Sequence, residues 1–381
     1  MKKQWQGRNF RLGMLGGGQL GRMFIQEALN YDVHVHCLDA DPEAPCSLIA
    51  SSFTVASLND YDAVMAFGQD KDVITVEIEN VSTKALAELE KQGKKVFPQA
   101  RVLEIIKDKG TQKEFYATHN LPTAPFELIA DKNELTSIAH EFPFVLKLRT
   151  GGYDGKGVQI IRSEKDLETA FDAPCIIEKM IPFEKELSVI VARNESGETK
   201  VYPTVECEFN PDANLVEFLF SPAEISKETE LKAQEIALNV IDKLEMVGLL
   251  AVELFLTADG EILINEIAPR PHNSGHHTIE CCYTSQFEQH LRSIVNAPLG
   301  NTDLIVPGVM INLLGAEGSD GKAKYEFLEE AMEMQGVAVH LYGKEKTKSF
   351  RKMGHVTVYH PDLNYCKETG LKLLNSMKVT S

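Results

Sequence analysis

Two glutamates on either side of an Asp-Gly turn are the residues best placed for metal chemistry. The segment 251–267 holds two runs typical of β-strands around Asp259-Gly260, and Asp-Gly is a strong signal for a two-residue hairpin turn. A turn centred there places Glu253 opposite Glu266, where the carboxylates repel each other unless a divalent cation binds between them. The same register pairs Phe255 with Ile264 and Thr257 with Ile262 on the face of the glutamates, and Leu254 with Asn265 on the other face. Because the neighbours on the glutamate face are largely apolar, we predict a partly buried Mg²⁺ site; two glutamates on a solvated face are the alternative.

A lysine interrupts a second apolar run. The segment Phe144–Leu148 is typical of a β-strand but contains Lys147. Such a lysine is either exposed on one face of an edge strand or paired with a buried anion. Because the glycine-dense loop 149–157 follows at once, we expect phosphate as the partner and a loop that closes over a ligand. Lys109 precedes this region and alone reads as a surface lysine.

A glycine loop near the start of the chain could bind an anion. Gly16–Gly21 satisfies G-x-G-x-x-G between a predicted strand, 10–15, and a predicted helix, 20–29. Backbone N–H groups at the N-terminus of such a helix bind phosphate or another anion. Asp39 follows at the spacing of a ribose-binding acid in a dinucleotide site. The motif alone fits a nicotinamide cofactor, a phosphorylated substrate, or glycines needed only for close strand–helix packing.

Two further segments carry polar side chains suited to a small substrate. Segment 269–276 reads Pro-Arg-Pro-His-Asn-Ser-Gly-His and begins three residues after Glu266, with two prolines that stiffen it. An ordinary surface loop is the alternative. Segment 342–355 is basic within an acidic chain, which indicates either a solvated charge run or a phosphate-binding loop.

The elements that must position these residues predict a mixed fold, α/β and α+β. Strand patterns at 10–15, 33–38 and 73–78 alternate with helical patterns, which is typical of a doubly wound parallel sheet. A smaller lobe has a helix at 113–118 and strands at 144–148 and 175–178. A larger α+β part has a helix at 231–244 and strands from 304 to 359. The predicted domains are 1–105, 106–182 and 183–381.

One helix start is predicted from a local signature. Ser221-Pro-Ala-Glu224 has the form of a capping box with proline at the first helical position, ahead of the amphipathic segment 231–244.

Composition excludes several classes of protein. A length of 381 residues suggests two or three domains. The formal net charge of -17 argues against a nucleic-acid partner but leaves room for a local basic pocket. The seven cysteines form no C-x-x-C pair, so we expect neither a zinc site nor a disulfide framework. The polar N-terminus and the lack of a run of ~20 apolar residues favour a cytoplasmic enzyme with no membrane partner.

Five motifs in order resemble the ATP-grasp superfamily and, within it, the family of 5-(carboxyamino)imidazole ribonucleotide synthases of purine biosynthesis. They are Gly16-Gly-Gly-Gln-Leu-Gly-Arg-Met23, Glu77-Ile-Glu-Asn80, Gly151-Gly-Tyr-Asp-Gly-Lys-Gly157, Asn265-Glu-Ile-Ala-Pro-Arg-Pro-His-Asn-Ser-Gly-His276 and Arg351-Lys-Met-Gly-His355. The resemblance covers nearly the whole chain. It implies an ATP-grasp architecture and a homodimer.

The resemblance also implies a reaction. ATP phosphorylates bicarbonate to carboxyphosphate, and the exocyclic amine of aminoimidazole ribonucleotide captures the carboxyl group, leaving ADP and phosphate. Mg²⁺ on Glu253 and Glu266, with Lys109 and Lys147, would provide the positive charge that phosphoryl transfer needs.

Particular residues receive roles by this resemblance. The ATP-binding residues are Lys109, Lys147, Gly152, Gly155, Gly157, Glu178, Lys179, Met180, Ile181, Glu186, Asn265 and Glu266. The residues near the carboxylation chemistry are Tyr153, Asp154, Lys156 and Arg270. The substrate-binding residues are Gly18, Gln19, Leu20, Glu77, Tyr153, Arg270, His272, Asn273, Ser274, Lys344 and Arg351.

Two departures from the family pattern bear on these roles. Lys156 stands where the family often has Arg, which keeps the charge but loses the bidentate fork. Cys207 and Phe209 stand where the family usually has Asn and His, so the histidine's role at the nucleotide is not assigned to Phe209.

Rival functions remain open from the sequence. Another ATP-grasp ligase, such as a formate-dependent glycinamide ribonucleotide transformylase or a biotin carboxylase, would use the same glutamates; the basic segment favours a phosphorylated substrate over biotin. A nicotinamide-dependent oxidoreductase would leave Glu253, Glu266 and Lys147 unused, and an NADH fluorescence change on mixing would favour it. A nucleotide-binding protein without activity would lack metal-dependent ATP hydrolysis.

Overall fold

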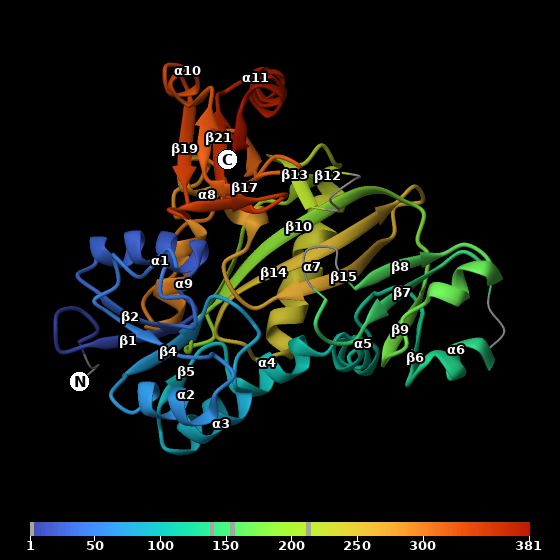
Figure 1. The fold of residues 1–381 in the computed structure, drawn as a ribbon, viewed down its shortest axis with the longest axis horizontal. Coiled ribbons are helices and arrows are strands. Elements are labelled where there is room, and N and C mark those ends of the chain that lie inside the picture. The colour runs from blue at the N-terminus through green and yellow to red at the C-terminus, as the bar shows by residue number, and fades with distance from the viewer. Residues whose placement is uncertain (1–3, 138–140, 153–156, 211–214) are drawn as a thin grey trace.

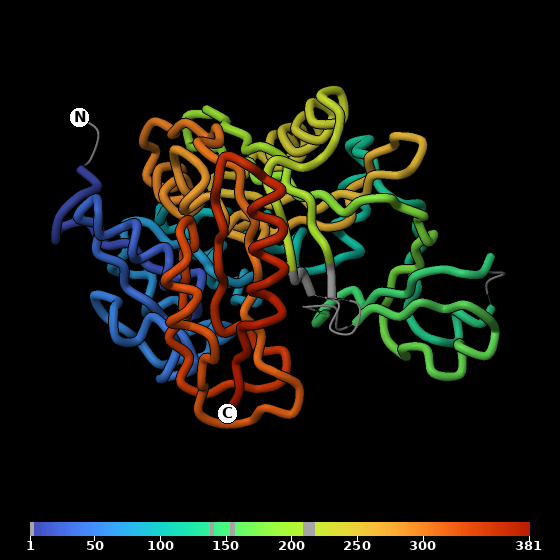
Figure 2. Tube along the Cα trace, turned by 90° about the horizontal axis from the view of Figure 1, so that it is seen from above, coloured from blue at the N-terminus to red at the C-terminus, as the bar shows by residue number. Residues whose placement is uncertain are grey.

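The computed structural model describes residues 4–137, 141–152, 157–210 and 215–381. Three larger sheets organise this part of the chain (Figure 1). Seen from above, the small green lobe and the orange-red C-terminal part extend in different directions from the body (Figure 2). Each helix in the described ranges is too short or too polar to cross a lipid bilayer.

The first sheet is parallel, in the order β3-β2-β1-β4-β5, as the alternating pattern predicted. Its strands are β1 Arg11–Leu15, β2 His34–Asp39, β3 Ser52–Val55, β4 Val73–Val76 and β5 Lys95–Val96. The helices of this region are α1 Gln19–Asn30, α2 Tyr61–Gly68, α3 Thr83–Lys91 and α4 Ala100–Lys107. Strands β1 and β4 are buried along almost all their length, which explains their continuous apolar sequences. The carboxyl end of β1 leads into the glycine loop 16–21, and that of β4 leads into Glu77. In a parallel sheet of this kind, ligands bind at the carboxyl ends of the strands.

The second sheet is antiparallel and forms the small lobe, in the order β6-β9-β7-β8. Its strands are β6 Phe126–Ile129, β7 Phe144–Leu148, β8 Val158–Ile161 and β9 Cys175–Lys179. Helix α5 Lys109–Thr118 leads into the lobe, and α6 Lys132–Ser137 and a 3₁₀ helix, Glu164–Thr169, complete it. The two strands predicted for this lobe are confirmed.

The third sheet runs through the rest of the chain, in the order β15-β14-β10-β12-β13-β16-β21-β19, with β11 paired to β10. Its strands are β10 Phe183–Arg193, β11 Thr199–Val201, β12 Val205–Asn210, β13 Leu215–Ser221, β14 Gly248–Thr257, β15 Ile262–Ala268, β16 Gly308–Leu314, β19 Val337–Leu341 and β21 Lys352–Tyr359. Helix α7 Lys227–Lys243 buries Ala237, Val240 and Ile241 in the core it shares with β10 and β14. Helix α11 Leu363–Ser376 packs on β16 and β21.

The remaining short elements connect these parts. They are a 3₁₀ helix Asn273–Gly275, α8 Thr278–Cys281, α9 Gln286–Ile294, β17 Asp320–Lys322, β18 Lys324–Glu326, α10 Leu328–Met332, β20 Lys346–Lys348 and β22 Lys378–Thr380.

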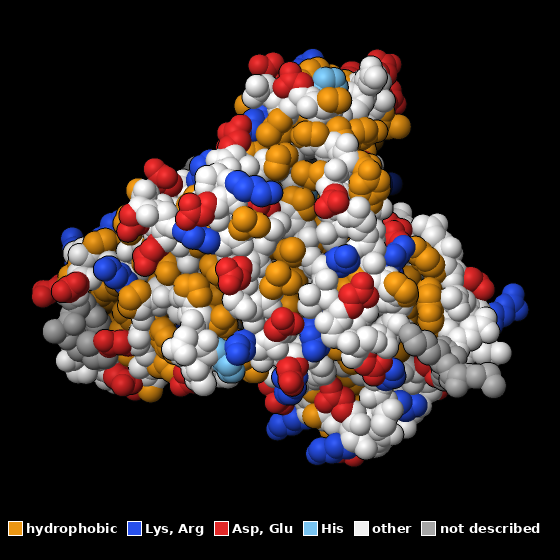
Figure 3. Space-filling model, turned by 180° about the vertical axis from the view of Figure 1, so that it is seen from behind, with side chains coloured by type: hydrophobic (Ala, Val, Ile, Leu, Met, Phe, Trp, Pro, Cys, Tyr) orange, Lys and Arg blue, Asp and Glu red, His pale blue; other side chains and the backbone are white. Residues whose placement is uncertain are grey.

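On the face opposite to Figure 1, acidic and basic side chains are interspersed over the body (Figure 3).

The predicted helix start at Ser221–Glu224 is wrong. Ser221 ends β13, and α7 begins at Lys227 with Ser226 as its N-cap. The backbone N–H of Ala223 donates to the Thr204 carbonyl at 3.0 Å, and that of Glu224 to Glu206 Oε2 at 3.2 Å. The backbone N–H groups of Ala223 and Glu224 therefore bond to β12 and to the segment before it, and a helix does not begin here.

Candidate functional site

Glu253 on β14 and Glu266 on β15 face each other, as the turn position predicted. Between this pair and the turn the predicted register is wrong by one residue, because the Thr257 N–H donates to the Glu261 carbonyl at 3.0 Å and the turn therefore has three residues in place of two. The observed pairs are Leu254 with Ile264, Phe255 with Leu263 and Leu256 with Ile262. Asn265 is therefore the extra residue of a β-bulge, which re-aims a side chain. Its amide oxygen accepts a hydrogen bond from Lys147 Nζ at 3.0 Å, so the bulge brings Asn265 into the site of the glutamates.

Three lysines from the small lobe and α5 meet the acids of this region. Lys109 forms an ion pair with Glu266. Glu178 at the end of β9 is bound by two ammonium groups, with Lys147 Nζ 2.7 Å from Oε2 and Lys113 Nζ 2.7 Å from Oε1. Burial raises the pKa of Glu178, but the two lysines outweigh it and leave the pKa below its usual value. The buried anion beside Lys147 is thus a protein carboxylate.

Lys113 is the member of this group that the sequence reasoning missed. Its side chain is almost fully buried in α5, and its ammonium also donates to Thr123 Oγ1 at 2.5 Å. The hydroxyl of Thr123 in turn donates to the Ile264 carbonyl at 2.9 Å, next to the bulge in β15. A signal was present, since Lys113 lies three residues before Tyr116, on the buried face of the helix.

The electrostatics of the two glutamates fit a divalent cation. Burial and the charge of Glu266 raise the pKa of Glu253, whereas Lys109 lowers the pKa of Glu266. Ionising Glu253 in this buried place beside Glu266 therefore costs free energy, and a bound cation would remove that cost. Carboxylate oxygens are ligands that Mg²⁺ prefers. Across the described ranges, no three His, Cys, Asp or Glu residues form a group that could hold a metal ion. A cation on this pair would take its other ligands from substrate and water.

The residues expected to bind the nucleotide lie around this group. Lys179–Ile181 continue from Glu178 at the exposed end of β9. Glu186 lies on β10, where burial raises its pKa to about 7 against the opposing effect of Lys147. Gly152 and Gly157 lie in the loop 149–157 that follows β7. Four predicted site residues lie outside the described residues: Tyr153, Asp154, Gly155 and Lys156.

Segment 269–276 is fixed by a buried glutamine. Gln286 Oε1 accepts from the His272 N–H at 2.8 Å, and Gln286 Nε2 donates to the His272 carbonyl at 2.8 Å. His272 Nε2 lies 3.5 Å from Glu253 Oε1, which joins this segment to the paired glutamates. Arg270 Nε lies 2.8 Å from Glu79 Oε1.

Two other members of this segment pair with strands of the large sheet. Asn273 and Asn312 exchange two amide hydrogen bonds of 2.8 Å. The Ser274 hydroxyl lies 2.7 Å from that of Ser188 on β10. Both side chains of the segment are thus held by their neighbours.

The glycine loop binds an anion that belongs to the protein itself. One Glu77 oxygen accepts the Gly18 N–H and the other accepts the Gly21 N–H at 2.7 Å, at the start of α1 where Gln19 and Leu20 lie. A Cβ on Gly18 would lie 2.5 Å from Glu77 Oε1, so glycine is needed for this approach. Asp39 accepts the Gly17 N–H at 2.7 Å. Carboxylates of the protein itself therefore accept the N–H groups for which a ligand phosphate was one alternative.

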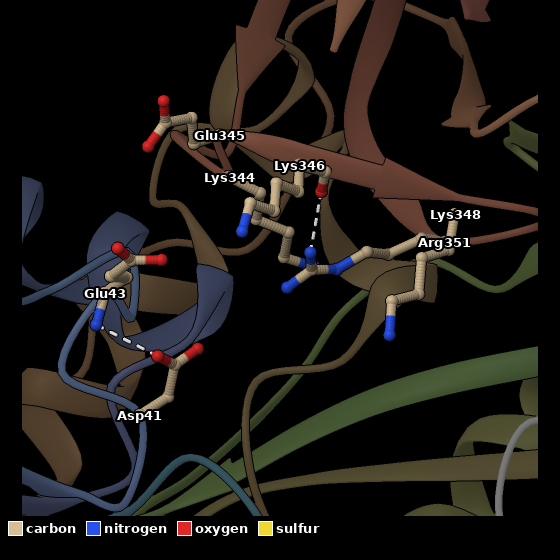
Figure 4. A pocket seen from close by; sticks show the side chains of 7 residues that line it. All are labelled: Asp41, Glu43, Lys344, Glu345, Lys346, Lys348 and Arg351. Carbon is tan, nitrogen blue, oxygen red and sulfur yellow. Dashed lines mark hydrogen bonds between the residues drawn. The ribbon is translucent and has the colours of Figure 1, made fainter. Parts of the chain in front are cut away.

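The basic segment lines a pocket of about 390 Å³ between the C-terminal part and the loop after β2 (Figure 4). The lining side chains are Asp41, Glu43, Lys344, Glu345, Lys346, Lys348 and Arg351. Lys344 Nζ donates to the Lys352 carbonyl at 2.7 Å, and Arg351 donates to the Lys346 carbonyl at 2.6 Å. Lys344 and Arg351, predicted to bind a phosphate, thus share one pocket.

Comparison with known proteins places the chain in a family. Residues 10–107 match the ribonucleotide synthetase preATP-grasp domain, residues 114–287 the ATP-grasp domain, and residues 308–369 the phosphoribosylaminoimidazole carboxylase C-terminal domain. The N5-carboxyaminoimidazole ribonucleotide synthase of Bacillus subtilis is 40% identical over 373 residues, 96% of this chain and 95% of that protein.

Solved structures agree with these matches. The N5-carboxyaminoimidazole ribonucleotide synthetase of Thermotoga maritima is 43% identical with a TM-score of 0.90, over 98% of this chain and 99% of that one. The Aspergillus clavatus enzyme, solved with ADP and 5-aminoimidazole ribonucleotide, is 32% identical with a TM-score of 0.88, over 98% of both chains. The chain therefore belongs to the N5-carboxyaminoimidazole ribonucleotide synthase family, with an ATP-grasp domain at its centre.

Proposed function

We propose that this protein is an ATP-dependent, ADP-forming ligase of purine biosynthesis that carboxylates aminoimidazole ribonucleotide with bicarbonate. The observation that carries this proposal is the network joining Lys109 to Glu266 and Lys147 to Glu178 and Asn265, which gathers two cations and the facing glutamates between the small lobe and the large sheet. Phosphoryl transfer from ATP needs this combination of positive charge and metal-binding carboxylates. Family membership and the ligands of the Aspergillus relative support the same reading.

In the first step, a bicarbonate oxygen bonds to the γ-phosphorus of ATP and the bond to ADP breaks, which gives carboxyphosphate. Lys109 and Lys147 would hold the phosphate groups, and Lys179–Ile181 with Glu186 would hold the adenosine. Mg²⁺ on Glu253 and Glu266, with Asn265 beside them, would neutralise charge on the phosphate oxygens.

In the second step, the exocyclic amine bonds to the carboxyl carbon, phosphate leaves and the nitrogen loses a proton. Arg270, His272 and Asn273 would face this centre, because His272 reaches Glu253 and Gln286 fixes their segment. Tyr153, Asp154 and Lys156 of the loop 149–157 are proposed to lie near the carboxylation chemistry. Gly152, Gly155 and Gly157 of the same loop are proposed to bind the nucleotide. A closed loop would exclude water from carboxyphosphate, which water destroys.

The ribonucleotide would bind at the carboxyl ends of the strands of the first sheet. Lys344 and Arg351 line the pocket where its phosphate would bind, together with two further lysines and three acidic side chains. Gly18, Gln19, Leu20, Glu77 and Ser274 complete the proposed substrate site. The division at 1–105, 106–182 and 183–381, the homodimer and the cytoplasmic location belong to the same proposal.

The test is ADP release with Mg²⁺, ATP and bicarbonate, with and without aminoimidazole ribonucleotide. We expect ADP only with the ribonucleotide, together with the carbamate product. ADP release that ignores the ribonucleotide would favour another ATP-grasp ligase with a different phosphorylated amine. No ADP under any of these conditions would refute the proposal.

A further inference from the structure

The two phosphate-binding lysines proposed above come from segments that a bidentate ion pair joins. Arg149 directly follows β7 and Asp108 directly precedes α5. Arg149 Nε lies 2.9 Å from Asp108 Oδ1, and its terminal nitrogen 2.8 Å from Oδ2, so the pair is bidentate. This geometry fixes both the distance and the relative orientation of the two groups. Lys109 follows Asp108 by one residue, and Lys147 precedes Arg149 by two.

Backbone contacts strengthen the same junction. Asp108 Oδ1 accepts the N–H groups of Gly110 at 2.7 Å and Thr111 at 3.1 Å, so the carboxylate caps α5 while it binds the guanidinium. The Lys109 N–H donates to the Arg149 carbonyl at 2.8 Å. The two lysine-bearing segments are therefore joined by side chains and by backbone at one place.

Gly110 leaves the space that the pair needs. A Cβ at this position would lie 2.5 Å from Arg149 Nε and 2.8 Å from its guanidinium carbon. Any larger residue would move the guanidinium off Asp108. Gly110 is in the first turn of α5, where alanine is the better helix former by about 1 kcal/mol. A purely structural requirement of the helix would therefore favour alanine.

We propose that the Asp108–Arg149 pair, with Gly110 beneath it, is a positioning device that sets the spacing of Lys109 and Lys147 for the phosphates of the nucleotide. The inference rests on the proposed function, since it assigns Lys109 and Lys147 to the phosphates. Displacing phosphate-binding groups by about 1 Å is sufficient to lower binding and turnover by one to two orders of magnitude.

The experiment measures the ADP affinity of the full-length protein by calorimetry, in the presence of Mg²⁺, for wild type, Arg149→Met, Gly110→Ala and the double variant. We expect each single variant to weaken ADP binding by about tenfold and the double variant to be no weaker than Arg149→Met, because both act through one guanidinium. Independent, additive losses would overturn the proposal.

Charge is controlled separately. Arg162→Met removes an exposed cation of the small lobe and should leave ADP affinity within about twofold. Asp108→Asn removes a negative charge, so electrostatics alone would tighten ADP binding, whereas the positioning role predicts weaker binding. Tighter binding in Asp108→Asn would refute the inference. A wild-type protein that binds no ADP would instead refute the proposed function.

Discussion

Replacing Glu186 by Gln is predicted to stabilise the protein above neutral pH while it weakens nucleotide binding. The pKa of Glu186 is raised from 4.5 to about 7 because its carboxyl group is buried on β10. The folded state therefore binds a proton more tightly than the unfolded state, and the free energy of unfolding falls as pH rises from about 4.5 to about 7. At 1.36 kcal/mol per pKa unit the full shift corresponds to about 3 kcal/mol, and partial exposure to water reduces this to about 1–2 kcal/mol.

The assay is denaturant unfolding of wild type and Glu186→Gln at about pH 5 and about pH 8. Glutamine carries no charge to desolvate, so the variant should gain most of this stability at the higher pH and little at the lower pH. ADP affinity should fall at both, because Glu186 is assigned to the adenosine. A stability difference that does not grow with pH would refute the reasoning about burial, and an unchanged ADP affinity would refute the assignment.

Three further changes probe the site. Lys113→Met leaves Glu178 buried with one ammonium partner and should cost about 2–4 kcal/mol in unfolding free energy, most of which Lys113→Arg should restore; a loss below about 0.5 kcal/mol would contradict the buried pair. Glu266→Gln should abolish ADP formation in a protein with an unchanged circular dichroism spectrum, and a variant that unfolds would instead show that Glu266 is structural. Arg351→Met should raise KM for the ribonucleotide about tenfold or more with KM for ATP unchanged, and equal rises in both would count against a phosphate-binding role.

What the sequence predicted well depends on local patterns. The parallel sheet and the small-lobe strands follow from apolar periodicity. The facing of Glu253 and Glu266 was predicted from an Asp-Gly turn, and it holds because the bulge at Asn265 cancels a one-residue shift next to that turn. The bulge at Asn265 was missed because an inserted residue leaves every side chain type unchanged and only shifts which partner it meets. The register between the turn and the glutamates could therefore not be predicted from the turn alone.

Contacts between distant segments were the other limit. Lys113 and Glu178 are 65 positions apart, and nothing near either residue states that they share a buried site. Ser221–Glu224 shows the opposite failure, since a correct local signature for a helix start is overruled by hydrogen bonds to the neighbouring strand and the segment before it. Glu77 shows both failures. The glycine motif was recognised locally, but the carboxylate that accepts its N–H groups lies far along the chain and could not be predicted from the motif.

The Glu77 carboxylate also bears on which metabolites could bind at the glycine loop 16–21. An incoming dinucleotide would have to bring its pyrophosphate to N–H groups that Glu77 already holds, and the approach would set like charges against each other in a partly buried place. The chain thus keeps the glycine-loop topology of a dinucleotide fold, while its own carboxylates occupy the N–H groups that a dinucleotide's pyrophosphate would need. In a cell rich in nicotinamide dinucleotides, this built-in occupant would leave the neighbouring substrate site free of them.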